Sequence, residues 1–320
     1  MANKAFFHEA MATTYNLKFP GLEISEAEHV ATRCFHLLDE LEARMSRFIP
    51  DSDISRVNKL RAGESMWLEE EVHSCLKSAI EISVATDGYF DIGTAALSDI
   101  YRGMKSGLLN DYEYEQAIEQ ALVEKQEGSL YVNPAEPMVH CFKEGIKIDL
   151  GGIGKGFALD YLANTCREQG VTTFCLDAGG STVLVETDLE DTWEYHLAAG
   201  KERKQIDIAN GSISASGSRQ QGDHIFNPIT GQNDERLYDR LWVSADTAMH
   251  SDAYATAFFS MEPEQIATVL EENASISWVS YAKKGLIHHI RKSAARSENR
   301  PKQQVDDQIA SNSDNRKIAI

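Results

Sequence analysis

The chain has 320 residues, of which 42% are hydrophobic, and 31 basic against 50 acidic side chains give a formal net charge of −19. This length fits one large domain or two smaller ones, and the apolar content argues against a chain that is disordered throughout. The negative charge disfavours nucleic acid as a partner because a phosphate backbone would be repelled, and no apolar run approaches the roughly 20 residues of a membrane span.

Helical periodicity marks the first third of the chain. Ser25 and Glu28 have the spacing of a capping box, and the apolar pattern behind them continues to Met45 and ends before Pro50. Two further helices are predicted over 70–85 and 111–125.

A β–α–β unit is predicted next. Its first strand covers 145–150, its helix 157–168 and its second strand 171–176. The elements expected after this unit are strands near 181–185, 193–198, 205–208, 241–243 and 276–281, a helix that starts near Ser251 with that residue as N-cap, and a helix from Pro263 to 272. Helices mixed with mostly antiparallel strands indicate an α+β fold. We assign 1–290 to one domain and the polar segment 291–320 to a mobile C-terminal tail.

The five cysteines are widely spaced and include no C-x-x-C pair, so a disulfide scaffold or a zinc site is not expected. Buried thiols in a reducing compartment are the simpler interpretation. Neither an apolar leader nor a lipidation cysteine is visible near Met1, and we therefore expect a cytoplasmic protein.

The segment from Asp149 to Gly156, DLGGIGKG, joins a predicted strand to a predicted helix. Its glycines would let the backbone approach a ligand closely, and a helix N-terminus favours anions. The spacing matches neither a P-loop nor a dinucleotide fingerprint. The residues alone leave ligand binding and a plain tight turn equally open.

Two further segments have chemistry that could be functional or merely structural. Asp252 and Thr256 share a helix face, and their oxygens would suit Mg²⁺; alternatively, Asp252 simply favours the helix N-terminus. His224 has a reference pKa suited to acid–base work, although an isolated histidine is more often structural. Aromatic residues such as Phe48 and Phe90 could face an aromatic ligand or belong to the core.

Taken in order, these motifs resemble the FAD:protein FMN transferase family, the ApbE family. The resemblance extends from Met11 to Tyr281. The matching segments are Met11–Tyr15, Met45–Phe48, Ser55–Asn58, Asp87–Ile92, Ile148–Gly156 with Asp160, Asp177–Gly180, Ser216–Gly217, His224–Gly231 and Ser251–Ala257. Two departures are Asn227, where the family more often has Asp, and Phe48, where Tyr is common.

The resemblance implies an α+β domain related to the T-fold, with a mixed or antiparallel sheet and flanking helices. It implies Mg²⁺-dependent transfer of FMN from FAD to a Thr or Ser hydroxyl of an acceptor flavoprotein, with release of AMP. The positions that match metal ligands are Asp252, Thr256 and the backbone oxygen of Gly152. The positions that match flavin-nucleotide contacts are Met11, Phe48, Tyr89, Phe90, Asp91, Asp149, Lys155 and Ile225. His224 matches the histidine of the transfer step.

Two other activities fit the same residues. With water as acceptor, the cleft would act as an FAD pyrophosphatase that yields FMN and AMP; without turnover, the protein would store or deliver FAD. The pair Asp252 and Thr256 argues against pure storage because a binding module does not need a metal pair. The identity of the acceptor, the choice between Mg²⁺ and Mn²⁺, and the oligomeric state stay open.

Overall fold

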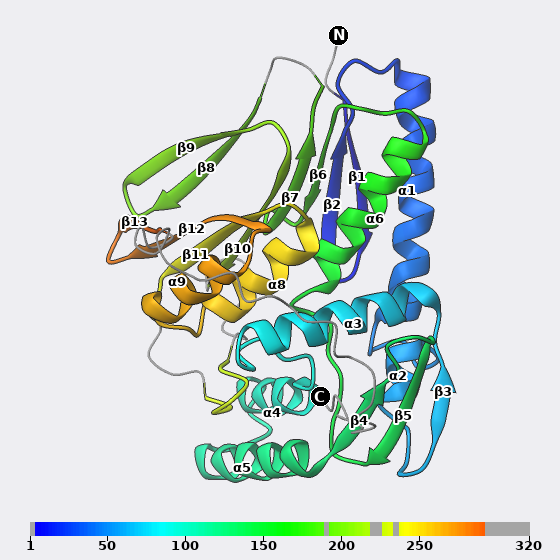
Figure 1. Cartoon of the computed structure of the whole chain (residues 1–320), viewed down its shortest axis with the longest axis vertical. Coiled ribbons are helices and arrows are strands. Elements are labelled where there is room, and N and C mark those ends of the chain that lie inside the picture. The colour runs from blue at the N-terminus through cyan, green and yellow to red at the C-terminus, as the bar shows by residue number, and fades with distance from the viewer. Residues whose placement is uncertain (1–3, 189–191, 218–225, 233–236, 292–320) are drawn as a thin grey trace, which may run out of the picture.

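A computed structural model describes residues 4–188, 192–217, 226–232 and 237–291. The segment 292–320, expected to be a tail, lies outside these residues. Within them, the main sheet has eight strands in the order β1-β2-β6-β7-β10-β11-β12-β13, and every strand pair is antiparallel (Figure 1). The strands are β1 (Ala5–Ala10), β2 (Thr13–Lys18), β6 (Phe174–Ala178), β7 (Thr182–Glu186), β10 (Gly211–Gly217), β11 (Arg240–Ala245), β12 (Ile276–Lys283) and β13 (Leu286–Ile290). The α+β prediction is confirmed.

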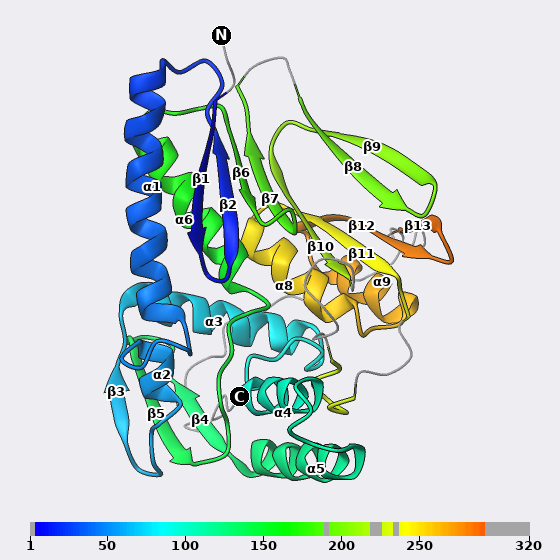
Figure 2. The ribbon, with the colours of Figure 1, turned by 180° about the vertical axis from the view of Figure 1, so that it is seen from behind.

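Two central helices, α6 (Gly154–Glu168) and α8 (Ala248–Phe258), pack against each other and against one face of this sheet. The long helix α1 (Ile24–Met45) packs against α6 and β1, as Figure 2 shows from behind. The other helices among the described residues are α2 (Asp53–Val57), α3 (Glu70–Ala85), α4 (Ala95–Lys105), α5 (Asp111–Glu127) and α9 (Pro263–Glu272). Helices α4 and α5 form a hairpin below α3 (Figure 1).

Two smaller sheets complete the described part of the chain. One has the order β3-β5-β4 and the other is the hairpin of β8 and β9. Their bounds are β3 (Ser65–Trp67), β4 (Ser129–Val132), β5 (Met138–Lys143), β8 (Trp193–Ala199) and β9 (Glu202–Ile208). Leu197 of the hairpin packs with Ile213 and Trp242 in a core of its own, on the sheet face opposite to α8.

The helices predicted from apolar periodicity are present, but the two predicted N-terminal caps are not. The helix at 70–85 is confirmed as α3, and the Pro263 helix is confirmed as α9. The capping box of Ser25 and Glu28 is wrong, because α1 already begins at Ile24 after Glu23. Ser251 is not an N-cap either: α8 begins three residues earlier, so the Ser251 hydroxyl lies inside the helix, 2.7 Å from that of Ser214.

The predicted strand at 145–150 is also wrong. The segment is extended, but it pairs with no described strand. Instead, the Ile148 N–H donates to Asn58 Oδ1 at 2.6 Å, and the Asp149 N–H donates to the Ile92 carbonyl at 2.7 Å. Asn58 is the C-cap of α2 and Ile92 precedes α4, so these hydrogen bonds hold the start of the glycine turn beside both helices.

The cysteine prediction agrees with the structure: all five thiols are buried and none is in a disulfide. Over the described ranges, no helix combines the length and apolar character that crossing a bilayer requires.

Candidate active site

A cleft of about 1100 Å³ opens where the glycine turn, α8, the end of β10 and the α4 helix meet. Ten of the residues predicted for the site line it together. They are Met11, Phe48, Tyr89, Phe90, Asp91, Asp149, Gly152, Lys155, Asp252 and Thr256. The other two, His224 and Ile225, lie outside the described residues. Predicted residues that are up to 245 positions apart in the chain therefore line one cavity.

The glycine turn brings the start of α6 against α8. A Cβ atom on Gly156 would lie 2.2 Å from the Ala248 carbonyl oxygen, so only glycine permits this approach of the two helices. A Cβ on Gly152 would lie 3.1 Å from Thr256 Cγ2. The close contact places the Gly152 carbonyl beside the face of α8 that carries Asp252 and Thr256.

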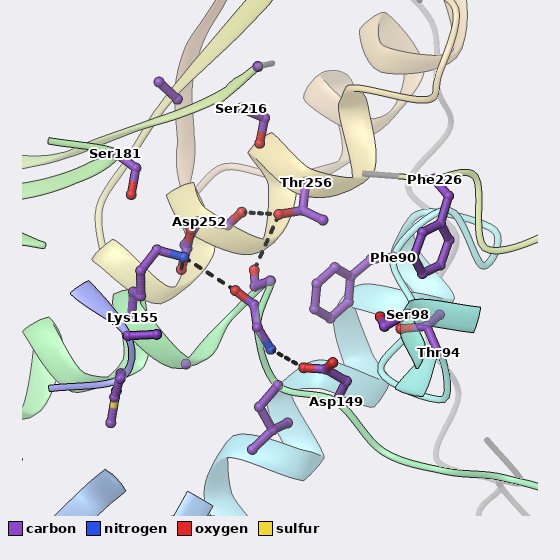
Figure 3. Close-up of a pocket in the computed structure, with 18 of the residues that line it drawn as sticks. Phe90, Thr94, Ser98, Asp149, Lys155, Ser181, Ser216, Phe226, Asp252 and Thr256 are labelled. Atoms are coloured by element: carbon purple, nitrogen blue, oxygen red, sulfur yellow. Dashed lines mark hydrogen bonds and ion pairs between the residues drawn. The ribbon is translucent and has the colours of Figure 1, made fainter. Parts of the chain in front are cut away.

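The Thr256 hydroxyl and two backbone carbonyl oxygens meet at this contact, and the Asp252 carboxylate lies on the same helix (Figure 3). The Thr256 hydroxyl lies 3.4 Å from the Gly152 carbonyl oxygen and 3.1 Å from the Asp252 carbonyl oxygen. The Asp252 carboxylate is buried, and its Oδ2 accepts the Gly156 N–H at 3.0 Å and lies 3.4 Å from Lys155 Nζ. Lys155 also donates to the Gly151 carbonyl at 3.2 Å.

This donor set fits a hard divalent cation. All the donors are oxygen atoms, which Mg²⁺ and Mn²⁺ prefer, and only one is a carboxylate. In the described ranges, no group of three or more His, Cys, Asp or Glu side chains could hold a metal. A cation at Asp252 would therefore have to share its remaining positions with water or with the oxygens of an anionic ligand.

The opposite side of the cleft combines aromatic rings with side-chain hydroxyl groups. Phe90, Phe226, Thr94 and Ser98 gather there, across from Lys155 and Asp252 (Figure 3). Thr94 and Ser98 belong to the start of α4, a helix that the sequence analysis did not predict. Phe226 stands in the quoted His224–Gly231 motif but received no role, because nothing in a single sequence distinguishes it from a core residue.

The acidic and aromatic residues predicted here are held by local contacts. Asp91 forms an ion pair with Lys125 of α5, and its Oδ1 accepts the Gly93 N–H at 2.6 Å. Phe48 is 64% exposed at the rim, and the guanidinium carbons of Arg47 and Arg102 lie 4.5 and 4.8 Å from its ring centroid.

Asp160 fastens α6 to the start of α8. Its two carboxylate oxygens accept the N–H groups of Ala248 and Met249, at 2.8 and 2.9 Å. Burial raises the pKa of Asp160 from 3.8 to about 6, although the two backbone donors act in the opposite direction.

This shift predicts a pH dependence of stability. Between about pH 4 and pH 6 the unfolded chain has released the Asp160 proton while the folded chain keeps it. The contribution of Asp160 to the free energy of unfolding therefore falls as pH rises through this window, by up to about 3 kcal/mol, and is level above it. Thermal unfolding of the wild type and of Asp160→Asn from pH 4 to 7 measures the effect. A stability difference that instead grows with pH would mean that the backbone hydrogen bonds outweigh burial.

Comparison with known proteins places the chain in a family. The profile of the ApbE family matches residues 11–279. The chain belongs to the ApbE family. A relative from Vibrio cholerae named FAD:protein FMN transferase is 24% identical over 284 residues, which cover 82% of this chain and 83% of the relative. A relative of the same name from Buchnera aphidicola is 22% identical over 288 residues, covering 85% and 84%.

Solved structures agree on the fold of this ApbE family member. The flavin transferase ApbE from Vibrio cholerae superposes with a TM-score of 0.76 at 21% identity, over 91% of this chain and 98% of that one. The ApbE protein from Thermotoga maritima gives 0.75 at 22% identity, over 90% and 97%. The resemblance predicted from the motifs is thereby confirmed for family and fold, while the roles of individual residues stay predictions.

Proposed function

We propose that this chain transfers the FMN part of FAD to a Thr or Ser hydroxyl of an acceptor protein, in a Mg²⁺-dependent reaction that releases AMP. The observation that carries the proposal is the meeting of the Gly152, Asp252 and Thr256 oxygens with the Lys155 ammonium in one large cleft. The names of the relatives, FAD:protein FMN transferase, support the same activity.

The chemistry requires these residue types. The acceptor oxygen attacks the phosphorus atom on the FMN side, the bond from that phosphorus to the bridging oxygen breaks, and AMP leaves with that oxygen. A Mg²⁺ ion held by Asp252, Thr256 and the Gly152 carbonyl would offset the negative charge that develops on the pyrophosphate. Lys155 adds a second cation beside it, which matters in a chain with a net charge of −19.

The cleft also suits the size and shape of the substrate. Sites for small molecules commonly have volumes of about 300–1000 Å³, and this cleft is larger. The partly exposed rings of Tyr89 and Phe226 offer stacking surface for a flavin ring, with the buried Phe90 behind them, and Thr94 and Ser98 offer hydroxyls to a polar chain. Space beyond the dinucleotide would admit a segment of an acceptor protein.

The test is an FAD turnover assay with Mg²⁺ and with EDTA, with and without a panel of peptides that contain Thr or Ser. Mass spectrometry reads the products. We expect an FMN-sized mass increase on an acceptor, lost with EDTA. Free FMN and AMP regardless of acceptor would instead assign an FAD pyrophosphatase, and bound but uncleaved FAD across the panel would assign a binding protein.

His224 is the residue that we propose as the base for the acceptor hydroxyl. A Thr hydroxyl is a weak nucleophile, so a nearby base contributes roughly 100- to 10 000-fold. We therefore expect His224→Ala to lower kcat for transfer within this range while the Kd for FAD changes little. Fluorescence titration of FAD and single-turnover transfer separate the two quantities. A large loss of FAD affinity with a normal rate at saturation would contradict this role.

A further inference from the structure

Arg47 has a buried side chain between two walls of the cleft, the glycine turn and α4. It follows α1 directly, and the Ser55 hydroxyl holds its backbone carbonyl at 2.8 Å. Its side chain is only 9% exposed. A guanidinium so removed from water is costly unless charged partners compensate it, so its contacts indicate what it does.

Those contacts join the glycine turn to α4. Arg47 Nε donates to Asp149 Oδ2 at 2.8 Å, while its two terminal nitrogens donate to the two carboxylate oxygens of Asp99 at 3.0 and 3.1 Å. Burial alone would lower the pKa of Arg47, but the two carboxylates outweigh burial and raise it. Lysine could not reproduce this arrangement because it lacks a planar group that reaches both carboxylates.

Asp149 connects Arg47 to the backbone of the glycine turn in the proposed nucleotide site. Its second oxygen accepts the Gly151 N–H at 2.9 Å, and its own N–H is fixed by the Ile92 carbonyl. In the same turn, the Gly151 carbonyl accepts a hydrogen bond from Lys155, and the Gly152 carbonyl accepts one from the Thr256 hydroxyl. A carboxylate held on both oxygens therefore fixes the turn from which these carbonyls project.

Asp99 connects Arg47 to the opposite wall of the cleft, which α4 forms. It lies on α4 next to Ser98 and five residues after Thr94, the two hydroxyl residues that line the opposite wall. Arg102 also pairs with Asp99, but from the exposed side. Arg47 therefore adds a buried side-chain link between the two walls, beside the backbone hydrogen bonds from Asp149 to Ile92 and from Ala95 to Lys147.

We propose that Arg47 is a positioning residue for the nucleotide site, because its guanidinium sets the spacing between the glycine turn and the α4 wall. This inference rests on the proposed function, since the nucleotide in question is FAD. Arg47 would act through Asp149 and Asp99 and need not touch the substrate.

The experiment compares Arg47→Met and Arg47→Lys with the wild type. The Kd for FAD is measured by flavin fluorescence, once with EDTA and once with Mg²⁺, and kcat and KM are measured by AMP release. A charge-assisted bond of this kind predicts a roughly 10- to 100-fold weaker Kd for Arg47→Met, and a higher KM with a smaller change in kcat. Arg47→Lys should recover only part of the affinity.

A double variant tests whether Arg47 matters only because it neutralises Asp99. If Arg47 only balanced the charge of Asp99, Arg47→Met with Asp99→Asn would bind FAD like the wild type; we expect the double variant to stay weak. The matched control is Arg167→Met, which breaks an exposed pair with Glu186 on the far end of α6, and FAD affinity within twofold of the wild type is expected there. Thermal unfolding of every variant identifies any loss of folded protein.

The outcomes also separate this inference from the proposed function. Wild-type affinity in Arg47→Met, or full recovery in the double variant, would overturn the positioning role. A wild-type chain that neither binds nor cleaves FAD would overturn the proposed function itself, whatever the Arg47 variants do.

Discussion

Asp252→Asn is expected to lower Mg²⁺-dependent release of AMP from FAD by at least about 100-fold. Asparagine keeps the size of the side chain and one oxygen that can accept the Gly156 N–H. It loses the only carboxylate of the proposed donor set, and its amide nitrogen would take the place of Oδ1, which accepts from the Thr182 hydroxyl at 3.2 Å. A cation held by neutral oxygens alone binds weakly, so the Mg²⁺ concentration for half-maximal rate should rise as well.

The matched control is Asp246→Asn. Asp246 is exposed in the loop before α8, so the same chemical change outside the cleft should leave the rate within twofold of the wild type. The assay is AMP release across a Mg²⁺ titration, with circular dichroism to confirm folding. A normal rate and a normal Mg²⁺ response in Asp252→Asn would remove this residue from the metal site.

Gly156→Ala has the largest expected effect on stability. The added Cβ would lie 2.2 Å from the Ala248 carbonyl oxygen and 2.8 Å from Asp252 Cβ, so α6 and α8 must separate. Overpacking against backbone typically costs up to about 3 kcal/mol, and a rigid carbonyl at this distance puts the substitution at the upper end. In a domain of this size, this corresponds to a fall in Tm of roughly 5 °C.

Gly154→Ala is the companion variant for this measurement. It lies on the same helix, but its added Cβ would meet nothing closer than Leu150 Cβ at 3.9 Å. Its Tm should equal or slightly exceed that of the wild type, because alanine favours the helix. Equal Tm values for Gly154→Ala and Gly156→Ala would show that the helices can move apart without cost.

Parts of the fold could be predicted from sequence because their apolar patterns reach the core directly. The helix at 70–85 was predicted correctly since Val72, Leu76 and Ala79 are all buried on one face. At 145–150 the alternation is also real, and Ile146, Ile148 and Leu150 are buried. Alternation reports which side of an extended chain is buried, but it does not show whether a neighbouring strand is present, and here none pairs with it.

Other elements had no apolar pattern to read. Strand β10 places Ser212, Ser214 and Ser216 on the α8 face, where hydroxyls bond to Ser251 in place of apolar contacts. Helix α4 was missed because it buries few residues and contains Gly103.

The site was more predictable than these elements, since its motifs combine residue types and chain order. Ten of the twelve predicted residues line one cleft, and the other two lie outside the described residues. Ser98, in contrast, acquires its place only through tertiary contacts, and Arg47 received no role although it stands in the matching segment Met45–Phe48, because its partners Asp99 and Asp149 are distant in the sequence. A single sequence gives no signal for such contacts.

The pairing of β2 with β6 has a consequence for synthesis of the chain. Leu17 lies opposite Leu176 in the sheet, and Tyr15 and Leu17 are fully buried once the pair has formed. A ribosome that adds about 5–20 residues per second needs roughly 10–30 s to proceed from β2 to β6. During that interval the β1–β2 hairpin can be covered only by α1, so the nascent N-terminal segment exposes apolar surface and an unpaired strand edge while the rest of the chain emerges.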